Sequence, residues 1–257
     1  MAGLLGRFMT VLALAVNPVA AAAAYPDILH PGTTVVVAAI DGDTLQLADG
    51  RLVRLAAIMA PKDWEPLAAA AHAALTQAVG RSLRLEFGAR QTDRHGRLLA
   101  QAWFATADGT KDIWLQEMLL TQGLARVAST DDTRSLAPEL LRIEAQARNA
   151  RRGVWADPAY RVRSLEDAGH ALNSFQIVEG RVVTAARVHG GAYLNFGADY
   201  KTDFTLRFDG ESLRRLQESG IDLKSLVGVR LRARGWLRYF NGPLIDITHP
   251  EQIEVLE

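Results

Sequence analysis

Three stretches of the sequence contain residue types suited to the chemistry of phosphate groups. The turn IDGDTL holds Asp41 and Asp43, the segment VRL holds Arg54, and DRHGR holds His95 and Arg97. Carboxylate oxygens are the natural ligands of a hard cation such as calcium. Guanidinium forks hold phosphoryl oxygens as negative charge grows on them. These residue types suit a phosphate-bearing ligand, and the alternative for Arg54 is a strand arginine that snorkels or pairs with an acid.

A fourth motif follows these three in the chain, the helical GLARV, EAQAR and GVW segments between residues 123 and 155. The ordered set resembles the staphylococcal nuclease family over roughly residues 34–156. The resemblance implies nucleic acid as substrate and calcium as cofactor. It implies Asp43, with Asp41 beside it, as metal ligands, and Arg54 and Arg97 as catalytic arginines. It also places His95 where the family commonly has an aromatic residue that contacts the nucleotide, although a turn histidine is the alternative.

Two positions depart from the family pattern. Met59 and Lys62 stand where the family has a second metal-binding aspartate and the general-base glutamate. A thioether is a poor ligand for calcium, and a protonated lysine cannot take a proton from water. The site is therefore expected to be impaired in phosphodiester hydrolysis, with calcium bound weakly or not at all. Asp63 and Glu65 lie nearby and offer an alternative acidic set.

Lys62 could itself contribute to binding a phosphate group. Its ammonium, placed near Arg54 and Arg97, would supply part of the missing ion's charge and create a metal-free phosphate pocket. A solvated lysine in a loop is the alternative.

Hydrophobic patterning predicts the elements that position these residues. Strand patterns occur at 34–37, 45–47, 52–58, 82–87 and 97–104, with turns at Asp41-Gly42 and Asp49-Gly50. Helices are predicted at 66–79, 112–122 and 138–150, the second capped by Asp112 and ended by Gly123. This set indicates an α+β fold that is mainly β: a five-stranded OB-like Greek-key barrel with three helices.

The strand pattern stops after residue 156 and returns at Phe175. We therefore predict a nuclease-like domain at 25–156, a linker at 157–174 and a second small β-barrel at 175–257, for which an OB-like form is one option. The second domain has predicted strands at 176–185, 192–196, 204–208 and 229–239 and in the final QIEVLE, with a helix at 210–219.

The segment VRLRARGWLRY in the second domain carries a stripe of basic residues. Because alternate residues of a strand share a face, four arginines and one indole fall on one side: Arg230, Arg232, Arg234, Trp236 and Arg238. Such a face matches a single-strand nucleic-acid platform, in which charge follows the phosphates and a ring stacks on a base. The alternative is a solvated face whose arginines pair with acidic residues on neighbouring strands.

Composition limits the other classes of site. Lys plus Arg and Asp plus Glu both total 29, so binding to a polyanion must come from local clustering. The absence of cysteine excludes a disulfide, a thiol nucleophile and a thiolate metal site. The six histidines have no helical metal-ligand spacing, so no zinc site is expected.

The first 24 residues have the pattern of a secretory signal peptide. Arg7 precedes the apolar stretch 8–16, and small residues at 22–24 offer a cleavage site. The apolar stretch is too short to cross a bilayer. We therefore expect export to the periplasm or beyond, with no membrane span in the mature chain.

Three functions remain open from the sequence. The first is an exported thermonuclease-like pseudoenzyme that binds nucleic acid or another phosphate-bearing ligand. The second is an active calcium-dependent nuclease that uses a rearranged acidic set. The third is a non-catalytic envelope protein that uses its barrel surfaces for contacts with other molecules.

Overall fold

A computed structural model describes residues 34–106, 109–199 and 201–256. The predicted signal peptide at 1–24 lies outside these residues. Within them, no helix has the length and apolar character needed to cross a membrane.

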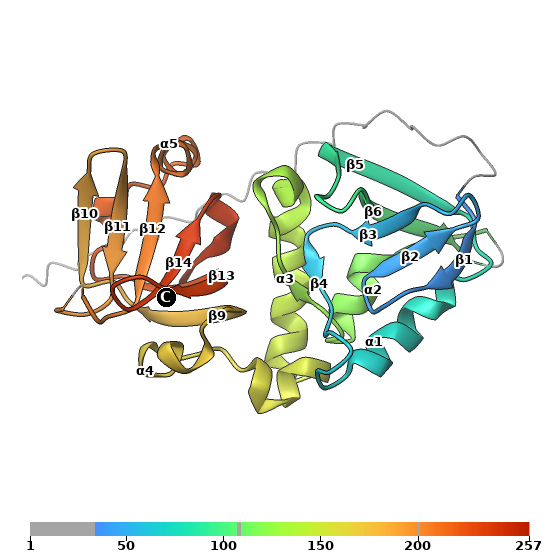
Figure 1. Cartoon of the computed structure of the whole chain (residues 1–257), viewed down its shortest axis with the longest axis horizontal. Coiled ribbons are helices and arrows are strands. Elements are labelled where there is room, and N and C mark those ends of the chain that lie inside the picture. Colours follow the sequence, from blue (N-terminus) through green and yellow to red (C-terminus); the bar gives the residue numbers. More distant parts are fainter. Residues whose placement is uncertain (1–33, 107–108, 200, 257) are drawn as a thin grey trace, which may run out of the picture.

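The N-terminal half of the described chain is built on a closed sheet (Figure 1). Its strands lie in the order β1 (Val36–Ala39), β2 (Thr44–Leu47), β3 (Leu52–Leu55), β6 (Leu98–Ala105) and β5 (Leu83–Thr92), with β7 (Asp112–Trp114) on β6. Only β3 and β6 run parallel; the other pairs are antiparallel. A bridge between Val35 and Ser82 connects the ends of the sheet and closes the barrel. The predicted α+β class and OB-like barrel are confirmed.

Three helices cover this barrel: α1 (Ala68–Leu75), α2 (Leu115–Thr121) and α3 (Ala137–Asn149). Its core takes buried aliphatic side chains from the strands and from these helices. Ala57, at a φ of 62°, interrupts the predicted strand 52–58, which resumes as β4 (Ile58–Met59) paired with β8 (Arg126–Val127). The prediction that Asp112 caps a helix is wrong. Residues 112–114 are strand β7, whose Trp114 stacks on Trp103 of β6 at 5.7 Å between ring centroids, and α2 begins at Leu115.

A second β domain follows, with its own separate core. Its strands are β9 (Ser174–Arg181), β10 (Thr184–Val188), β11 (Gly191–Asn195), β12 (Thr205–Asp209), β13 (Arg230–Tyr239), β14 (Pro243–Ile247) and β15 (Ile253–Leu256). They lie in the order β10-β11-β12-β14-β13-β15, and β9 also pairs with β13. Helix α5 (Gly210–Glu218) follows β12, and Asp209 caps it through the backbone N–H of Ser212. The predicted helix at 210–219 matches α5, whereas β14 was not predicted.

The segment 157–174, expected to be a linker, forms helical turns at Pro158–Tyr160 and Gly169–Ala171 and the short helix α4 (Leu165–Ala168). A small third core lies beneath it, where Tyr160 packs with Trp155 and with Ile177 of β9. The connection between the two domains is therefore packed against both of them.

Helix α3 lies between the barrel and the second sheet (Figure 1), and a buried network of charges joins them. The guanidinium of Arg234 on β13 is 2.9 Å from Glu144 Oε1 of α3 and 2.5 Å from Glu254 Oε1 of β15. Arg234 also donates to the carbonyl of Val127 at 3.1 Å. Arg148 of α3 binds both of the same glutamates, at 2.9 and 3.4 Å. Removing one partner of such a pair typically costs about 3–5 kcal/mol, because it leaves a buried charge uncompensated.

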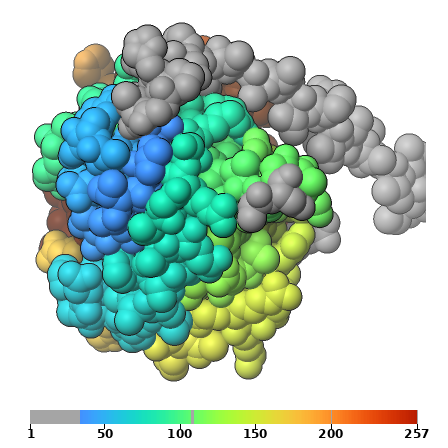
Figure 2. Space-filling model, turned by 90° about the vertical axis from the view of Figure 1, so that its right-hand side faces the viewer, coloured from blue at the N-terminus to red at the C-terminus, as the bar shows by residue number. Residues whose placement is uncertain are grey.

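Further polar contacts extend this junction away from the buried network. Arg134 reaches Glu251 at 3.1 Å, and Arg126 donates to the carbonyl of Phe175 at 3.2 Å. Figure 2 views the molecule from the side of the first domain, which covers almost all of the second domain in that view.

The pH dependence of folding should report on a buried histidine in this junction. His249 is fully buried, with its ring nitrogens 2.9 Å from Ser129 Oγ and 2.9 Å from Thr248 Oγ1. Burial, and then the charges of Arg134, Arg215 and Arg234, lower its pKa from 6.5 to about 4. The unfolded chain therefore binds the proton more tightly. His249 therefore does not reduce the free energy of unfolding above pH 6.5. As the pH falls from 6.5 toward 4, its titration lowers that free energy by up to roughly 3 kcal/mol.

We predict that His249→Gln flattens the dependence of the unfolding free energy on pH between 6.5 and 4.5, measured by urea denaturation. His189→Gln, at an exposed histidine, should keep the wild-type slope. An unchanged slope in His249→Gln would contradict the assignment.

Candidate phosphate-binding site

Asp43 lies at the centre of the candidate site, in the turn that leads into β2. Its side chain is fully buried. One carboxylate oxygen, Oδ2, accepts from the backbone N–H of Ala60 at 2.7 Å, and the other accepts from the Thr44 hydroxyl at 3.4 Å. A Cβ at Gly42 would come within 2.7 Å of the Cβ atoms of Ala60 and Ala71, so the DGDT turn needs glycine for this close packing. The turn is thereby held against the start of the loop after β4.

Arg54 faces Asp43 from β3, with Nη2 at 3.1 Å from Oδ2. It also donates to two carbonyl oxygens, those of Leu55 at 2.7 Å and Ile58 at 2.9 Å. These contacts fix the guanidinium across the break between β3 and β4. They leave the rest of its five N–H donors for a ligand.

The ammonium of Lys62 lies against the two aspartates of the DGDT turn. Its Nζ is 3.4 Å from each carboxylate oxygen of Asp43 and 3.8 Å from Oδ2 of Asp41. Asp41 in turn accepts from the backbone N–H of Asp43 at 2.9 Å. A positive charge from the chain itself therefore sits beside both carboxylates.

The pKa values of the two aspartates differ in direction. Burial raises the pKa of Asp43, against the opposing effect of the charges on Arg54 and then Lys62. At Asp41 burial also favours the neutral form, but the Asp43 N–H and the Lys62 charge outweigh it and lower the pKa. The positive side chains are thus what favours an ionised Asp43 in an enclosed position.

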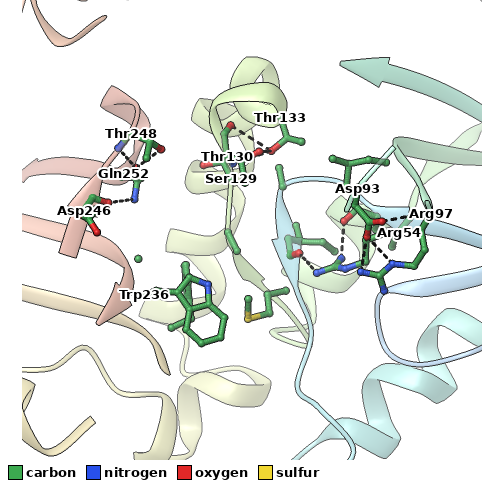
Figure 3. A pocket seen from close by; sticks show the side chains of 18 of the residues that line it. Arg54, Asp93, Arg97, Ser129, Thr130, Thr133, Trp236, Asp246, Thr248 and Gln252 are labelled. Atoms are coloured by element: carbon green, nitrogen blue, oxygen red, sulfur yellow. Dashed lines mark hydrogen bonds and ion pairs between the residues drawn. The ribbon is translucent and has the colours of Figure 1, made fainter. Parts of the chain in front are cut away.

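Arg97 approaches the same point from the turn before β6. Asp93 holds it through two contacts of 2.7 Å, from Nε and from Nη2. Its Nη1 donates to the Thr44 hydroxyl at 3.4 Å, and that hydroxyl donates to Asp43. In Figure 3 the guanidinium groups of Arg54 and Arg97 lie next to one another, and both line the same cavity. The sheet brings them together because β3 pairs with both β2 and β6.

The cavity, of about 490 Å³, lies between the two domains. Arg54 and Arg97 line its side toward the barrel, and Trp236 lines the side toward the second sheet. Met59 of β4 is also among the lining residues. Hydroxyl groups lie between the two sides, from Ser129, Thr130 and Thr133 in the segment that leads into α3. Sequence reasoning missed these hydroxyls, because their segment carries no motif.

The arginine stripe of β13 occupies a different environment from the one predicted. Its residues share one face, but that face packs against α3 at Arg234, which is only 1% exposed and bound to Glu144. Arg232 pairs with Glu179 and Glu254, at 2.8 and 3.2 Å, and Arg230 also pairs with Glu179. The proposed substrate contact of Arg234 is therefore corrected to a structural ion pair, and Arg230 and Arg232 follow the alternative of pairing with neighbouring strands.

His95 lies in the exposed turn between β5 and β6, where the Arg94 Nε donates to its ring at 3.0 Å. It is not among the residues that line the cavity. Of His95 and the predicted stripe on β13, the structure brings Trp236 and Arg238 to the cavity that holds Arg54 and Arg97.

The alternative acidic residues do not converge on Asp43. Glu65 accepts from the backbone N–H of Lys62 at 2.6 Å. Burial, and then the charge of Glu65, raise the pKa of Tyr160 to about 12, which places Glu65 near the third core. Asp63 is exposed.

Comparison with known proteins agrees with this geometry. Residues 52–157 match the family model described as staphylococcal nuclease homologue. Protein ParB of Escherichia coli is 33% identical to this chain over 129 residues, which cover 48% of this chain and 72% of that protein. The chain belongs to the staphylococcal nuclease homologue family. Membership supports a nucleic-acid-binding or nuclease-like protein, and it makes calcium a plausible cofactor.

The side chains present here do not fit a calcium ion of the kind that the family implies. Calcium takes six to eight oxygen ligands. In the described ranges no group of three or more His, Asp or Glu side chains is placed to hold a metal ion. The oxygens of Asp43 are already engaged by Ala60, Arg54 and Lys62. An ion here would also lie against an ammonium group.

Neutralising Lys62 should change the titration of Asp43. The charge of Lys62 lowers the pKa of Asp43. Without that charge, the pKa of Asp43 should be higher in Lys62→Gln than in the wild type. Carboxyl carbon-13 NMR of Asp43 across pH would measure the change. Lys224→Gln, in the second domain, should leave Asp43 unchanged, and an unshifted Asp43 in Lys62→Gln would show that the ammonium does not face it in solution.

Proposed function

We propose that this protein is an exported staphylococcal nuclease homologue that binds nucleic acid or another phosphate-bearing ligand and has lost efficient phosphodiester hydrolysis. The observation that carries the proposal is the position of Lys62 Nζ, 3.4 Å from both carboxylate oxygens of Asp43. An ammonium group in that place supplies positive charge without a metal ion. The mature protein is proposed to act in the periplasm or outside the cell, from the signal-peptide pattern of its first 24 residues.

The arginines supply the binding half of the proposed function. Arg54 and Arg97 are each held by acidic or carbonyl partners, so neither has to be ordered when a ligand arrives. Their remaining N–H donors form a positive corner of the cavity. The Lys62 ammonium does not line the cavity; it lies against Asp43, which Arg54 also binds. A phosphate oxygen there would accept charge-assisted hydrogen bonds, which are shorter and stronger than neutral ones.

The loss of hydrolysis follows from the residues that replace the expected acids. Met59 lines the cavity with a thioether, and Lys62 carries a proton where a base is needed. Neither Glu65 nor Asp63 faces the corner formed by Arg54 and Arg97. Among the described residues that line the cavity, the carboxylates are Asp93 and Asp246, and each is held by arginine. We therefore propose that water is poorly activated here and that calcium binds weakly or not at all.

A binding titration tests the phosphate corner. Arg97→Gln should weaken binding of a fluorescent single-stranded oligonucleotide about tenfold in buffer with EDTA. It should also reduce the slope of log K against log salt by about 0.7, the value for one lost phosphate contact on a single strand. Fluorescence anisotropy at several salt concentrations gives both quantities.

Arg94→Gln is the matched control, because Arg94 stands three residues away in the same turn and does not line the cavity. It should keep the wild-type affinity and slope. Equal behaviour of the two variants would remove Arg97 from the binding site. Absence of any oligonucleotide binding by the wild type would favour a protein that uses its surfaces for other contacts.

Placing acidic residues at positions 59 and 62, where the family has them, should restore phosphodiester hydrolysis. Met59→Asp combined with Lys62→Glu should add a metal ligand and a base, and so gain calcium-dependent cleavage of single-stranded DNA. A general base alone is typically worth about 10²- to 10⁴-fold. The double variant should also melt about 5 °C or more higher at calcium concentrations hundredfold above its Kd, while the wild type shows no shift.

Each single substitution should gain much less than the pair, because it completes only half of the site. The opposite outcome is strong calcium-dependent cleavage by the wild type that disappears on Asp63→Ala or Glu65→Ala. That result would establish a working nuclease with a rearranged acidic set.

A further inference from the structure

The second domain continues the candidate site on one face of its sheet. Trp236 and Arg238 stand two residues apart on β13, so both project from the same side. Across the strands, Arg238 lies opposite Leu244 of β14. Asp246, two residues further on β14, is opposite Arg207 of β12, and Arg207 is opposite Tyr193 of β11.

Three hollows on this face share lining residues. The cavity between the domains includes Asp246 and Thr248, which also line a hollow of about 250 Å³. That hollow shares Val188 and Tyr193 with a third one, of about 400 Å³, to which Phe240 contributes an exposed ring. The three hollows therefore adjoin one another along this face, and we call them together the groove. It crosses five strands, from β13 to β10, or about 19 Å at the usual spacing between neighbouring strands.

The groove alternates aromatic rings with arginine side chains. Trp236 is 57% exposed although it lines a cavity, whereas Trp114 and Trp155 are buried. An exposed indole in a cavity offers a ring face to a ligand. Beyond it, Arg238 and Arg207 both pair with the carboxylate of Asp246, and Asp209 also lines the hollow, so two arginines and two aspartates share this part of the face.

We propose that this groove binds a single-stranded nucleic acid, with one base stacked on Trp236 and its phosphate at Arg54 and Arg97. The following nucleotides run over Arg238 and Arg207 toward the rings of Tyr193 and Phe240. This inference rests on the proposed function, because it adds base recognition to the same phosphate corner.

The exposed aromatic rings favour single-stranded nucleic acid over a duplex. Stacking on an aromatic side chain requires an unpaired base with a free face, which a duplex does not offer. Neighbouring guanidinium groups follow the phosphates, and rings accept any base, so little sequence preference is expected. Met59 also lines the cavity and places an apolar surface there.

The experiment compares two lengths of labelled oligothymidine, two and eight nucleotides, by fluorescence anisotropy in EDTA. Trp236→Leu should weaken binding of both about 5- to 100-fold, the loss of one stacked base. Tyr193→Leu should weaken binding of the octamer alone. Trp236→Phe keeps a ring and should recover most of the affinity, which separates stacking from a folding defect.

Trp64→Leu is the control, because Trp64 is 84% exposed and outside the three hollows. It should bind both oligomers as the wild type does. If Trp236→Leu binds within twofold of the wild type while Arg97→Gln is weakened, the base-stacking groove is wrong and the phosphate corner stands. If neither variant is weakened, both proposals fail. A duplex that competes as well as the single strand would also overturn the groove.

Discussion

A buried carboxylate needs a positive partner, and the arrangement of the candidate site follows from that need at Asp43. The turn that carries it packs so closely that only glycine fits at position 42, and Asp43 is enclosed with no solvent contact. In most of its family the charge would be shared with a metal ion. Here the neutralising charges come from Arg54 and Lys62. The negative charge of Asp43 is therefore balanced by side chains of the protein itself.

The second constraint is the charge network under β13. Arg234 and Glu144 bind each other in the interior. Arg234 is also bound by Glu254 of the neighbouring strand β15, and Glu144 by Arg148 one turn along α3. Such a network is weak support for stability, since apolar residues could replace it at similar free energy. It does, however, fix how α3 meets the second sheet. We regard that fixed position as what brings Trp236 opposite Arg54 and Arg97 (Figure 3).

Much of the barrel could be predicted, because alternation, acidic-glycine turns and ordered motifs point to the same elements. The errors have physical causes. Residues 112–114 fit a helical period as well as a strand, and only pairing with β6 decides between them. Strand β14 reads PLIDI, a buried run without alternation that begins with proline, so it gives no strand pattern. The environment of Arg234 could not be predicted either. The alternation of residues along a strand tells which side chains share a face, but not which element packs on that face.

The candidate site was predictable in its motif residues and less so in its surroundings. Arg54 and Arg97 were found from the family motifs, and the structure brings them to one cavity. The direction of Lys62 could not be read from sequence, since a long side chain on a loop reaches many positions. The wall formed by the second domain depends on a junction between segments about 90 residues apart in the chain, Glu144 and Arg234. The pattern of neighbouring residues in the sequence does not predict a contact between residues so far apart in the chain.

We propose that the ammonium of Lys62 takes the place of a metal ion beside Asp43. A crystal structure of the wild type grown with calcium and a short single-stranded oligonucleotide tests it most directly. We expect a phosphate bound by Arg54 and Arg97, Lys62 Nζ still in contact with Asp43, and no calcium at that carboxylate. A calcium ion bound to Asp43, with Lys62 turned away and Asp63 or Glu65 among its ligands, would contradict the account.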